Sequence, residues 1–338
     1  MNQTTKRQVA VVTGGAGFIG SHLVELLLNN GYKVRCIDNF SKGSLANLKS
    51  CEADSNLEIL GADIVDQERL ANVFRESSFT FHLAGIGDVV PSIENPKKYF
   101  ETNVTGTLNV FEEIRKQAPY SKIIYAASSS CYGNAEVPTN ENHKIQNLHP
   151  YALSKYLGET LALSLGGIYR ISTNSIRIFN AYGPRAINHQ TYGAVMGVFL
   201  KQKLENQPLT VIGDGLQKRD FIHVTDVARA FYHVSQLNSH GNIYNLGSGS
   251  PVSILELAHL LDGEIQYIPD RPGEPRITWA NNEKLINETG WRPLIPFEDG
   301  INDLLGKIED WRNTPLWSRN EIANATKLWF DTLASKEI

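Results

Sequence analysis

Two side chains four residues apart could do chemistry on an alcohol. Tyr151 and Lys155 form a Tyr-x-x-x-Lys spacing, which on a helix places both side chains on one face about one turn apart. A phenol has a reference pKa of about 10, so a tyrosine that acts as a base near pH 7 needs positive charge close by. The lysine ammonium can supply that charge. Because the same spacing also occurs on solvated helix faces, the surrounding elements must decide whether this pair has a function.

Hydroxyl side chains follow the strand-like run that precedes this helix. Residues 122–126 have an apolar strand pattern, and Ser128, Ser129 and Ser130 come directly after it. Ligands of doubly wound sheets bind at the carboxyl ends of the strands, so we expect these hydroxyls near Tyr151. Cys131, the next residue, is expected to pack in the interior.

The start of the chain predicts a phosphate-binding turn. The strand-like run 8–13 continues into Gly14, Gly17 and Gly20, and then into a helical pattern. Gly14 permits the tight turn, Gly17 leaves room for a pyrophosphate, and Gly20 lets the helix approach the strand. The helix N-terminus adds unpaired N–H groups. The next predicted strand ends at Asp38, where a carboxylate can bind a ribose 2′-OH and would repel a 2′-phosphate, so NAD is favoured over NADP.

Strand and helix patterns alternate along the first half of the chain. This alternation predicts an α/β protein with a Rossmann-type doubly wound parallel sheet and a smaller mixed α/β substrate-binding lobe. The predicted strands are 8–13, 33–37, 57–60, 79–83, 122–126 and 173–179, and the predicted helices are 18–30, 66–75, 94–118 and 150–166.

The chain is expected to divide into three parts. The main NAD-binding domain would span residues 1–180, and the substrate-binding lobe residues 181–312, with a segment near 220–250 returning to the main domain. A C-terminal helical extension would span 313–338 and contain an amphipathic helix over 322–333, to which no chemistry is assigned.

Composition places the chain among ordinary globular proteins. Its 338 residues are 41% hydrophobic and 20% charged, with a formal charge of −4, which gives no reason to expect nucleic acid or an anionic membrane as a partner. The first residues are polar, and no apolar run is long enough to span a bilayer. The three cysteines lack metal-ligand spacing. We therefore expect a cytoplasmic protein without a bound metal.

Together these motifs resemble those of extended short-chain dehydrogenase/reductases that act on nucleotide sugars, the epimerase and dehydratase family, and most of all its UDP-glucose and UDP-N-acetylglucosamine 4-epimerases. The resemblance covers about residues 8–311. It rests on Thr13 through Gly20, Asp38-Asn39-Phe40, Asp63-Ile64, His82 through Gly85, Asn103 through Thr107, Ser128 through Gly133, Tyr151 with Lys155, and Arg219 through Val224.

The resemblance implies how NAD is held. Asp38 and Asn39 would hold the adenosine ribose, and Lys155 the nicotinamide ribose. Asn103 would either act near the cofactor or be an ordinary helix residue. The full implied set is Gly14, Gly17, Phe18, Ile19, Gly20, Asp38, Asn39, Asp63 and Ile64 at the adenine, Leu83 and Ala84 at the pyrophosphate, Asn103, Tyr151 and Lys155.

The resemblance also implies a nucleotide-sugar site. Arg219 and Arg271 would clamp the diphosphate, since planar guanidinium groups suit phosphate oxygens, although either could instead form a surface salt bridge. The implied substrate residues are Ser128, Ser129, Asn180, Arg185, Arg219, Arg271 and Thr278. Thr278 stands where the family gates the N-acetyl group, and its small side chain would leave room for N-acetylhexosamines.

The resemblance implies that Tyr151, Lys155 and Ser128 are catalytic, with Tyr151 taking the proton of the sugar 4-OH while hydride passes to NAD. The dehydratase branch carries an adjacent Asp-Glu where this chain has Ser129 and Ser130. A serine hydroxyl has no pKa near neutrality for that work, so redox-neutral 4-epimerisation is expected. Dehydration, decarboxylation, 4-keto-sugar reduction and a non-catalytic dinucleotide-binding regulator are the alternatives.

Two further features bear on the assembly and the substrate. The apolar stripes of helices 94–118 and 150–166 imply, by the same resemblance, a homodimer seam of four helices, although they could simply face the sheet. The loop that contains Asp88 departs from common family versions, and its role stays open.

Overall fold

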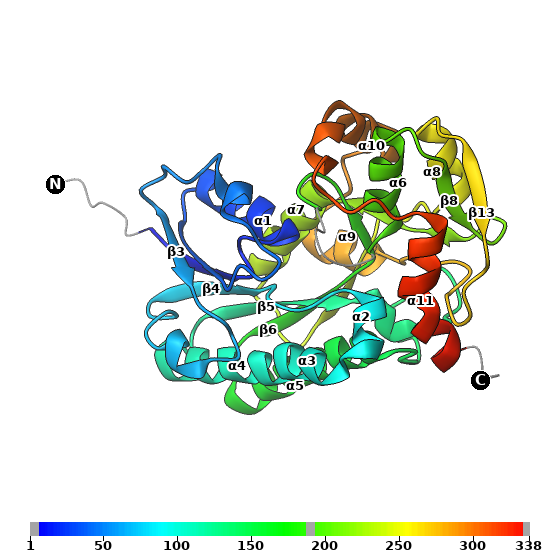
Figure 1. Ribbon diagram of the computed structural model, residues 1–338. Helices are drawn as coiled ribbons and strands as arrows, with labels where there is room; N and C mark the ends of the chain where they lie inside the picture. Colours follow the sequence, from blue (N-terminus) through cyan, green and yellow to red (C-terminus); the bar gives the residue numbers. More distant parts are fainter. Residues whose placement is uncertain (1–6, 187–192, 334–338) are drawn as a thin grey trace.

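A seven-stranded parallel sheet forms the centre of the protein (Figure 1). The computed structural model describes residues 7–186 and 193–333. The strand order is β11-β6-β5-β4-β1-β2-β3, so the order reverses between β1 and β4. This is the Rossmann-type α/β fold that the alternating pattern predicted. The strands are β1 (Val9–Thr13), β2 (Lys33–Asp38), β3 (Leu57–Gly61), β4 (Ser77–His82), β5 (Lys122–Ser128), β6 (Thr173–Ile178) and β11 (Ile243–Leu246).

Helices cover both faces of the sheet (Figure 1). On one face α1 (Phe18–Asn29) packs on α7 (Val224–Ser235), and on the other α4 (Gly106–Gln117) packs on α5 (Pro150–Tyr169). All five residues of β1 are buried, because helices lie above and below it. This burial on both faces explains why the strands read as continuous apolar runs.

Two of the predicted helices differ from the structure. Residues 66–75 do not form an α-helix: a 3-10 turn over Gln67–Leu70 is followed by turns, and Asn72 has a left-handed φ of 68° that ends any helical path. Leu70, Val73 and Phe74 still enter the core, so the apolar spacing was real but did not require a helix. The predicted helix 94–118 is largely present, as a continuous helical path through α3 (Pro96–Phe100), a π-helical turn (Glu101–Thr105) and α4. Asn95 separates this path from a short preceding helix, α2 (Val89–Glu94).

A second, smaller core lies beyond the carboxyl ends of the strands. It includes the buried side chains of Phe199, Leu257 and Trp311. Its elements are α6 (Val195–Leu204), β8 (Leu209–Ile212), α8 (Ile254–Leu260), β13 (Ile265–Ile268) and α10 (Phe297–Gly306). Short strand pairs lie beside it: β7 (Asn180–Tyr182) with β10 (Phe221–His223), and β9 (Lys218–Arg219) with β12 (Val252–Ser253). Between these segments the chain returns to the large sheet through α7 and β11, while α9 (Glu283–Thr289) packs against β11.

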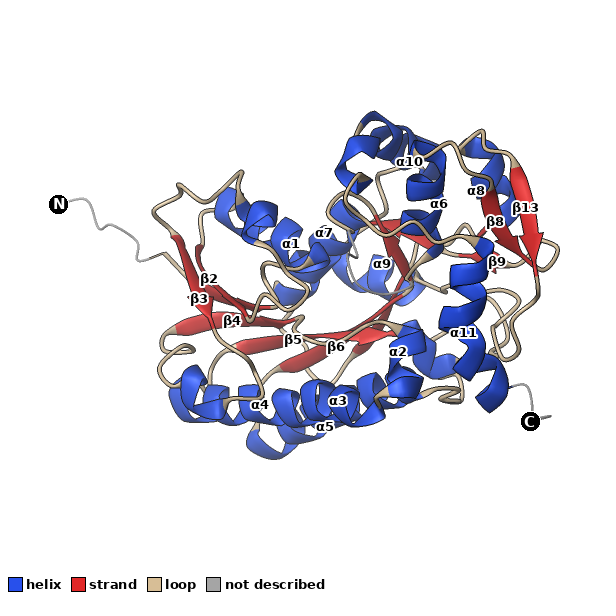
Figure 2. Cartoon of the chain, in the orientation of Figure 1, coloured by secondary structure: helices blue, strands red, loops and turns tan. Residues whose placement is uncertain are grey.

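The last described helix, α11 (Arg319–Leu333), lies beside α2 and below the second core (Figure 2). Its buried side chains Ile322, Thr326 and Trp329 follow a helical spacing, so one stripe of the helix faces the protein. Within the described ranges no helix is both long and apolar enough to cross a bilayer.

Candidate active site

The glycine turn between β1 and α1 provides an open anion site. Gly14 has a φ of 68°, and a Cβ there would lie 2.8 Å from the Ala84 nitrogen. A Cβ at Gly17 would meet only the Gly14 carbonyl oxygen within 4 Å, so one side of the turn is free. Gly17 also caps α1 without any side-chain hydrogen bond to the helix N-terminus. The first N–H groups of α1 are therefore available to a phosphate, as a dinucleotide requires.

Asp38 lies at the carboxyl end of β2, next to the glycine turn. Its Oδ2 accepts from the Ala16 N–H at 3.0 Å and its Oδ1 from the Phe40 N–H at 2.8 Å. Burial raises the pKa of this carboxyl, and the two N–H donors oppose that shift. Each oxygen keeps a second lone pair, which can accept a ribose hydroxyl.

The residues expected around the adenosine lie together beyond β2 and β3. Asn39 Nδ2 donates to Asp63 Oδ2 at 2.7 Å. The Ile64 side chain is buried in the core against Gly106, so only its backbone is left for a ligand. Ala84 follows β4 and donates its N–H to Thr13 Oγ1 at 3.2 Å, and Leu83 packs against the main core.

Asn103, in the π-helical turn, connects two segments of the chain through its side-chain amide. Its Oδ1 accepts from the Ile86 N–H at 2.9 Å, while its Nδ2 donates to the Ile86 carbonyl at 3.1 Å and to Ser154 Oγ at 2.9 Å. The side chain is 1% exposed, so these bonds use its polar atoms inside the protein. Asn103 therefore ties the loop after β4 to α5, the helix that carries Tyr151 and Lys155.

Tyr151 begins the first turn of α5, where His149 is the N-cap and Pro150 follows it. Burial raises the pKa of the Tyr151 phenol, and a hydrogen bond with Ser128 lowers it. Ser128 is the last residue of β5, which runs two residues beyond the predicted strand, and its Oγ donates to Ser130 Oγ at 3.0 Å. The phenol and the serine hydroxyl therefore lie at the carboxyl edge of the sheet.

Lys155 is buried one turn further along α5. Its ammonium lies 4.6 Å from the centre of the Tyr125 ring, a cation–π geometry. Burial lowers the pKa of Lys155 to about 8, and the nearby Glu159 carboxylate opposes that shift. Because burial disfavours the charged form of Lys155, an acceptor beside its ammonium would be bound favourably. Ribose hydroxyls and a phenolate are both acceptors of this kind.

A buried ion pair fixes the middle of α5 to the sheet. Arg177 of β6 donates to Glu159 Oε2 from Nη2 at 2.7 Å and from Nε at 3.0 Å. Ser175 Oγ donates to Glu159 Oε1 at 2.6 Å, so the carboxylate is well satisfied. These bonds hold the helix register that sets the positions of Tyr151 and Lys155.

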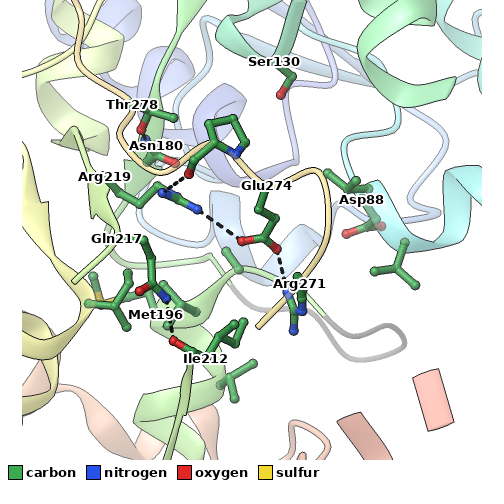
Figure 3. A pocket seen from close by; sticks show the side chains of 18 of the residues that line it. Asp88, Ser130, Asn180, Met196, Ile212, Gln217, Arg219, Arg271, Glu274 and Thr278 are labelled. Atoms are coloured by element: carbon green, nitrogen blue, oxygen red, sulfur yellow. Dashed lines mark hydrogen bonds and ion pairs between the residues drawn. The ribbon is translucent and has the colours of Figure 1, made fainter. Parts of the chain in front are cut away.

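A cavity of about 430 Å³ opens between the carboxyl edge of the sheet and the second core. His149, Ser129 and Ser130 line it on the sheet side, and these residues are chain neighbours of Tyr151 and Ser128. Figure 3 shows Arg219 and Arg271 on the opposite side.

The two arginines share one carboxylate. Arg219 Nη2 lies 3.2 Å from Glu274 Oε2, and Arg271 Nη1 lies 3.0 Å from Glu274 Oε1 (Figure 3). Arg219 also donates to the Pro275 carbonyl at 2.9 Å, and burial lowers its pKa. Two guanidinium groups that converge on two oxygens are arranged as a diphosphate would require.

Asn180 and Thr278 meet in the same cavity. Asn180 Nδ2 donates to Thr278 Oγ1 at 2.9 Å. Arg185 lies elsewhere: its Nη2 donates to Glu25 of α1 at 2.6 Å, and it is not part of the cavity wall. The structure thus brings five of the seven expected substrate residues, all but Ser128 and Arg185, into the cavity wall.

Three residues of this site were not singled out from the sequence. Glu274 had a visible signal, since it follows Arg271 by three residues. His149 precedes Pro150 and reads as a simple helix cap. Trp329 lies in the cavity wall although it is 178 positions further along the chain than Tyr151, and no local pattern indicates that.

Comparisons with known proteins agree with this geometry. A model of the NAD dependent epimerase/dehydratase family matches residues 10–247. The UDP-glucose 4-epimerase of Mycolicibacterium smegmatis is 33% identical over 301 residues, covering 86% of this chain and 95% of that protein. Two solved structures are also similar.

UDP-glucuronic acid 4-epimerase from Bacillus cereus, in complex with UDP-glucuronic acid and NAD, has a TM-score of 0.81 and 30% identity, covering 90% of this chain and 99% of that one. UDP-N-acetylglucosamine 4-epimerase from Methanobrevibacter ruminantium, in complex with UDP-N-acetylmuramic acid, has a TM-score of 0.83 and 29% identity. The match covers 89% of this chain and 98% of that one.

The fold and the family match thus define a dinucleotide-dependent enzyme. The chain belongs to the NAD dependent epimerase/dehydratase family. Its cofactor is NAD, and the open turn at Gly17, the free N-terminus of α1 and the carboxylate of Asp38 fit that dinucleotide.

Proposed function

We propose that this protein interconverts two nucleotide-diphosphate sugars by inverting the configuration at C4. The observation that carries the proposal is the group of Tyr151, Ser128 and Lys155 at the sheet edge, next to a cavity whose loop offers Ser129 and Ser130. These residues can oxidise and reduce an alcohol. They supply no second acid and base pair for elimination.

In this mechanism Tyr151 is the general base. Its hydrogen bond with Ser128 positions the phenol oxygen and favours its ionised form. The ammonium of Lys155, buried on the same helix face, adds electrostatic stabilisation of the phenolate. NAD, held by the glycine turn and Asp38, would supply the hydride acceptor and donor for C4. Tyr151 takes the proton of the 4-OH. After the 4-keto sugar turns over and hydride adds to the other face of C4, Tyr151 returns the proton to the 4-oxygen.

The substrate would be a UDP-hexose or a UDP-N-acetylhexosamine. Arg219 and Arg271 would bind the diphosphate in place of the Glu274 carboxylate that they share. Thr278 is small and lines the cavity, which supports room for an N-acetyl group. Asn180, bonded to Thr278, is placed to contact the sugar or the diphosphate.

We further propose a cytoplasmic homodimer with α4 and α5 at its seam. Leu108, Leu153 and Leu157 on these helices are 37–39% exposed. These apolar side chains would be covered if the two helices packed against a second copy of the chain. Phe111 and Leu165, from the same predicted stripes, instead pack into the core. The proposed dimer contact would therefore be made by the exposed leucines of α4 and α5, and not by the residues of these helices that face the core.

The reaction is tested with the purified protein and no added cofactor. A panel of UDP-, GDP-, CDP- and dTDP-sugars is incubated, and products are read by NMR and mass spectrometry. We expect one pair of C4 epimers of unchanged mass to interconvert, with NAD released on denaturation. Loss of water or of carbon dioxide would indicate a dehydratase or a decarboxylase, and stoichiometric consumption of added NADH a reductase.

A further inference from the structure

Trp329 of α11 forms part of the cavity wall beside the catalytic helix. Its side chain is 4% exposed, although it lies near the end of the described chain. The family model ends at residue 247, well before α11, so this wall lies outside the part of the chain that the model matches. The buried stripe of α11 and its packing on α2 hold the indole in place.

Hydrogen bonding and ring contacts connect this indole to both sides of the cavity. Its Nε1–H donates to the Pro272 carbonyl at 2.8 Å, in the loop that carries Arg271 and Glu274. The centroids of its ring and the His149 ring are 6.1 Å apart, and the two ring planes are inclined at 41°. His149 in turn stacks on Tyr151. One side chain therefore connects the diphosphate side of the cavity to the helix that carries the proposed base.

If Arg219 and Arg271 bind the diphosphate, as proposed, the hexose would lie beside Trp329, between these two sides of the cavity. A nucleotide sugar whose diphosphate lies at Arg219 and Arg271 must extend its sugar toward Tyr151, and the indole lies beside that path. A large, rigid apolar wall here restricts both the escape of a bound sugar and the entry of water.

We propose that Trp329 is a positioning residue that retains the 4-keto sugar in the cavity between its oxidation and its reduction. This inference rests on the proposed epimerisation. Epimerisation needs the ketone to turn over without leaving, because hydride must return to the same molecule. If the ketone leaves first, the sugar has lost two electrons and two hydrogens, and one equivalent of NAD stays behind as NADH. The enzyme is then inactive until it is reoxidised.

The test compares the Trp329→Ala, Trp329→Phe and Leu328→Ala variants with the wild type. Leu328 is the matched control, because it is the adjacent α11 residue and is 41% exposed. Each protein is incubated with the UDP-sugar that the wild type epimerises. Released 4-keto sugar is trapped with borodeuteride and counted by mass, NADH on the protein is read from its absorbance, and the dissociation constant of UDP is measured separately.

For Trp329→Ala we expect progress curves that stop early, at least about tenfold more keto sugar per turnover than the wild type, and matching NADH on the protein. UDP affinity should stay within about twofold, because Arg219 and Arg271 are intact. Trp329→Phe keeps a ring but loses the bond to Pro272, so it should release an intermediate amount. Leu328→Ala should behave as wild type.

Each outcome decides the inference. Wild-type progress curves without keto sugar or NADH in both Trp329 variants would overturn it. Should Trp329→Ala fail to fold, Trp329→Phe decides alone, because its ring fills most of the same space. A lowered turnover without any released ketone would also overturn it, since that is the sign of a merely structural role. If the wild type itself inverts no sugar, the proposed function fails rather than this inference.

Discussion

The imidazole of His149 stacks flat on the phenol of Tyr151, with ring centroids 5.8 Å apart and planes 5° apart. Burial lowers the pKa of His149 to about 4, so this ring is neutral at pH 7 and adds no positive charge beside the phenol. Burial also raises the pKa of Tyr151. If Tyr151 acts as the base, as proposed, the positive charge that favours its ionised form would come from Lys155 and from the nicotinamide of NAD.

Replacement of Tyr151 by Phe should remove turnover while the site stays formed. The ring and its stacking on His149 remain, and only the hydroxyl that moves the proton is lost. We expect kcat to fall by roughly 10²- to 10⁴-fold, with NAD content unchanged. Steady-state kinetics and the nucleotide released on denaturation measure both. Tyr120→Phe, at a side chain that is 65% exposed, is the control, and equal kinetics of the two variants would contradict the role of Tyr151.

Replacement of Lys155 by Met should stabilise the nucleotide-free protein near neutral pH. Burial lowers the pKa of Lys155 from its ordinary 10.5 to about 8 in the folded protein, so below pH 8 the buried charge costs about 3 kcal/mol. Between those two values the unfolded chain binds more protons than the folded one, and wild-type stability rises with pH. The stability advantage of the variant should therefore shrink from pH 7 to about pH 10.

Urea unfolding at both pH values measures this advantage. Lys116→Met serves as the control, because that side chain is 49% exposed. An advantage that is independent of pH would show that Lys155 carries no buried charge. Catalysis should fall in the same Lys155 variant, since its ammonium is needed for the phenolate.

Replacement of Glu274 by Gln should tighten the binding of UDP. The Glu274 carboxylate offsets one of the two positive charges of Arg219 and Arg271, and it would repel an incoming diphosphate. The amide keeps the shape and one acceptor without the charge. We expect a several-fold gain in affinity, on the order of 1 kcal/mol, by calorimetry at low salt. Asp214→Asn, which removes an exposed carboxylate paired to Arg276, is the control. Weaker binding by Glu274→Gln would show that this carboxylate instead orients the arginines.

Replacement of Thr278 by Tyr should shift the substrate preference. The larger side chain fills the part of the cavity that would accept an N-acetyl group. We expect the ratio of kcat/KM for a UDP-N-acetylhexosamine to that for the plain UDP-hexose to fall by about tenfold or more. Because the lost bond to Asn180 affects both sugars, it cancels in this ratio. Thr278→Ser keeps that bond and serves as the control, and an unchanged ratio in Thr278→Tyr would contradict the gate.

Short sequence patterns predicted the features that are formed by residues close together in the sequence. The spacing of Gly14, Gly17 and Gly20 before α1 predicted the phosphate turn, because each glycine acts within that turn. The sequence placed Ser128 just after a strand over 122–126, and in the structure the strand extends to include it, so the expected edge was right to within two residues. The apolar spacing at Leu70 and Phe74 led to a wrong helix, because left-handed turns place the same side chains in the core.

Long-range contacts could not be predicted in this way. The packing of Trp329 against His149 and Pro272 joins three distant segments, and neither its spacing nor its type indicates a partner. The ring of Tyr125 below Lys155 is similarly a consequence of how β5 packs on α5. Arg219 and Arg271 share Glu274 only because the loop around Glu274 returns to Arg219, from which it is separated by 55 positions in the sequence.

The most direct test of the account uses a UDP-sugar that carries deuterium at C4, incubated in ordinary water. If the same hydrogen is removed by NAD and returned on the other face, the epimer must keep its deuterium and take none from solvent. We therefore expect the NMR spectrum of the product to lack a C4 proton signal, with its mass equal to that of the substrate. Appearance of a C4 proton in the epimer would show exchange with solvent and contradict redox-neutral inversion by this site.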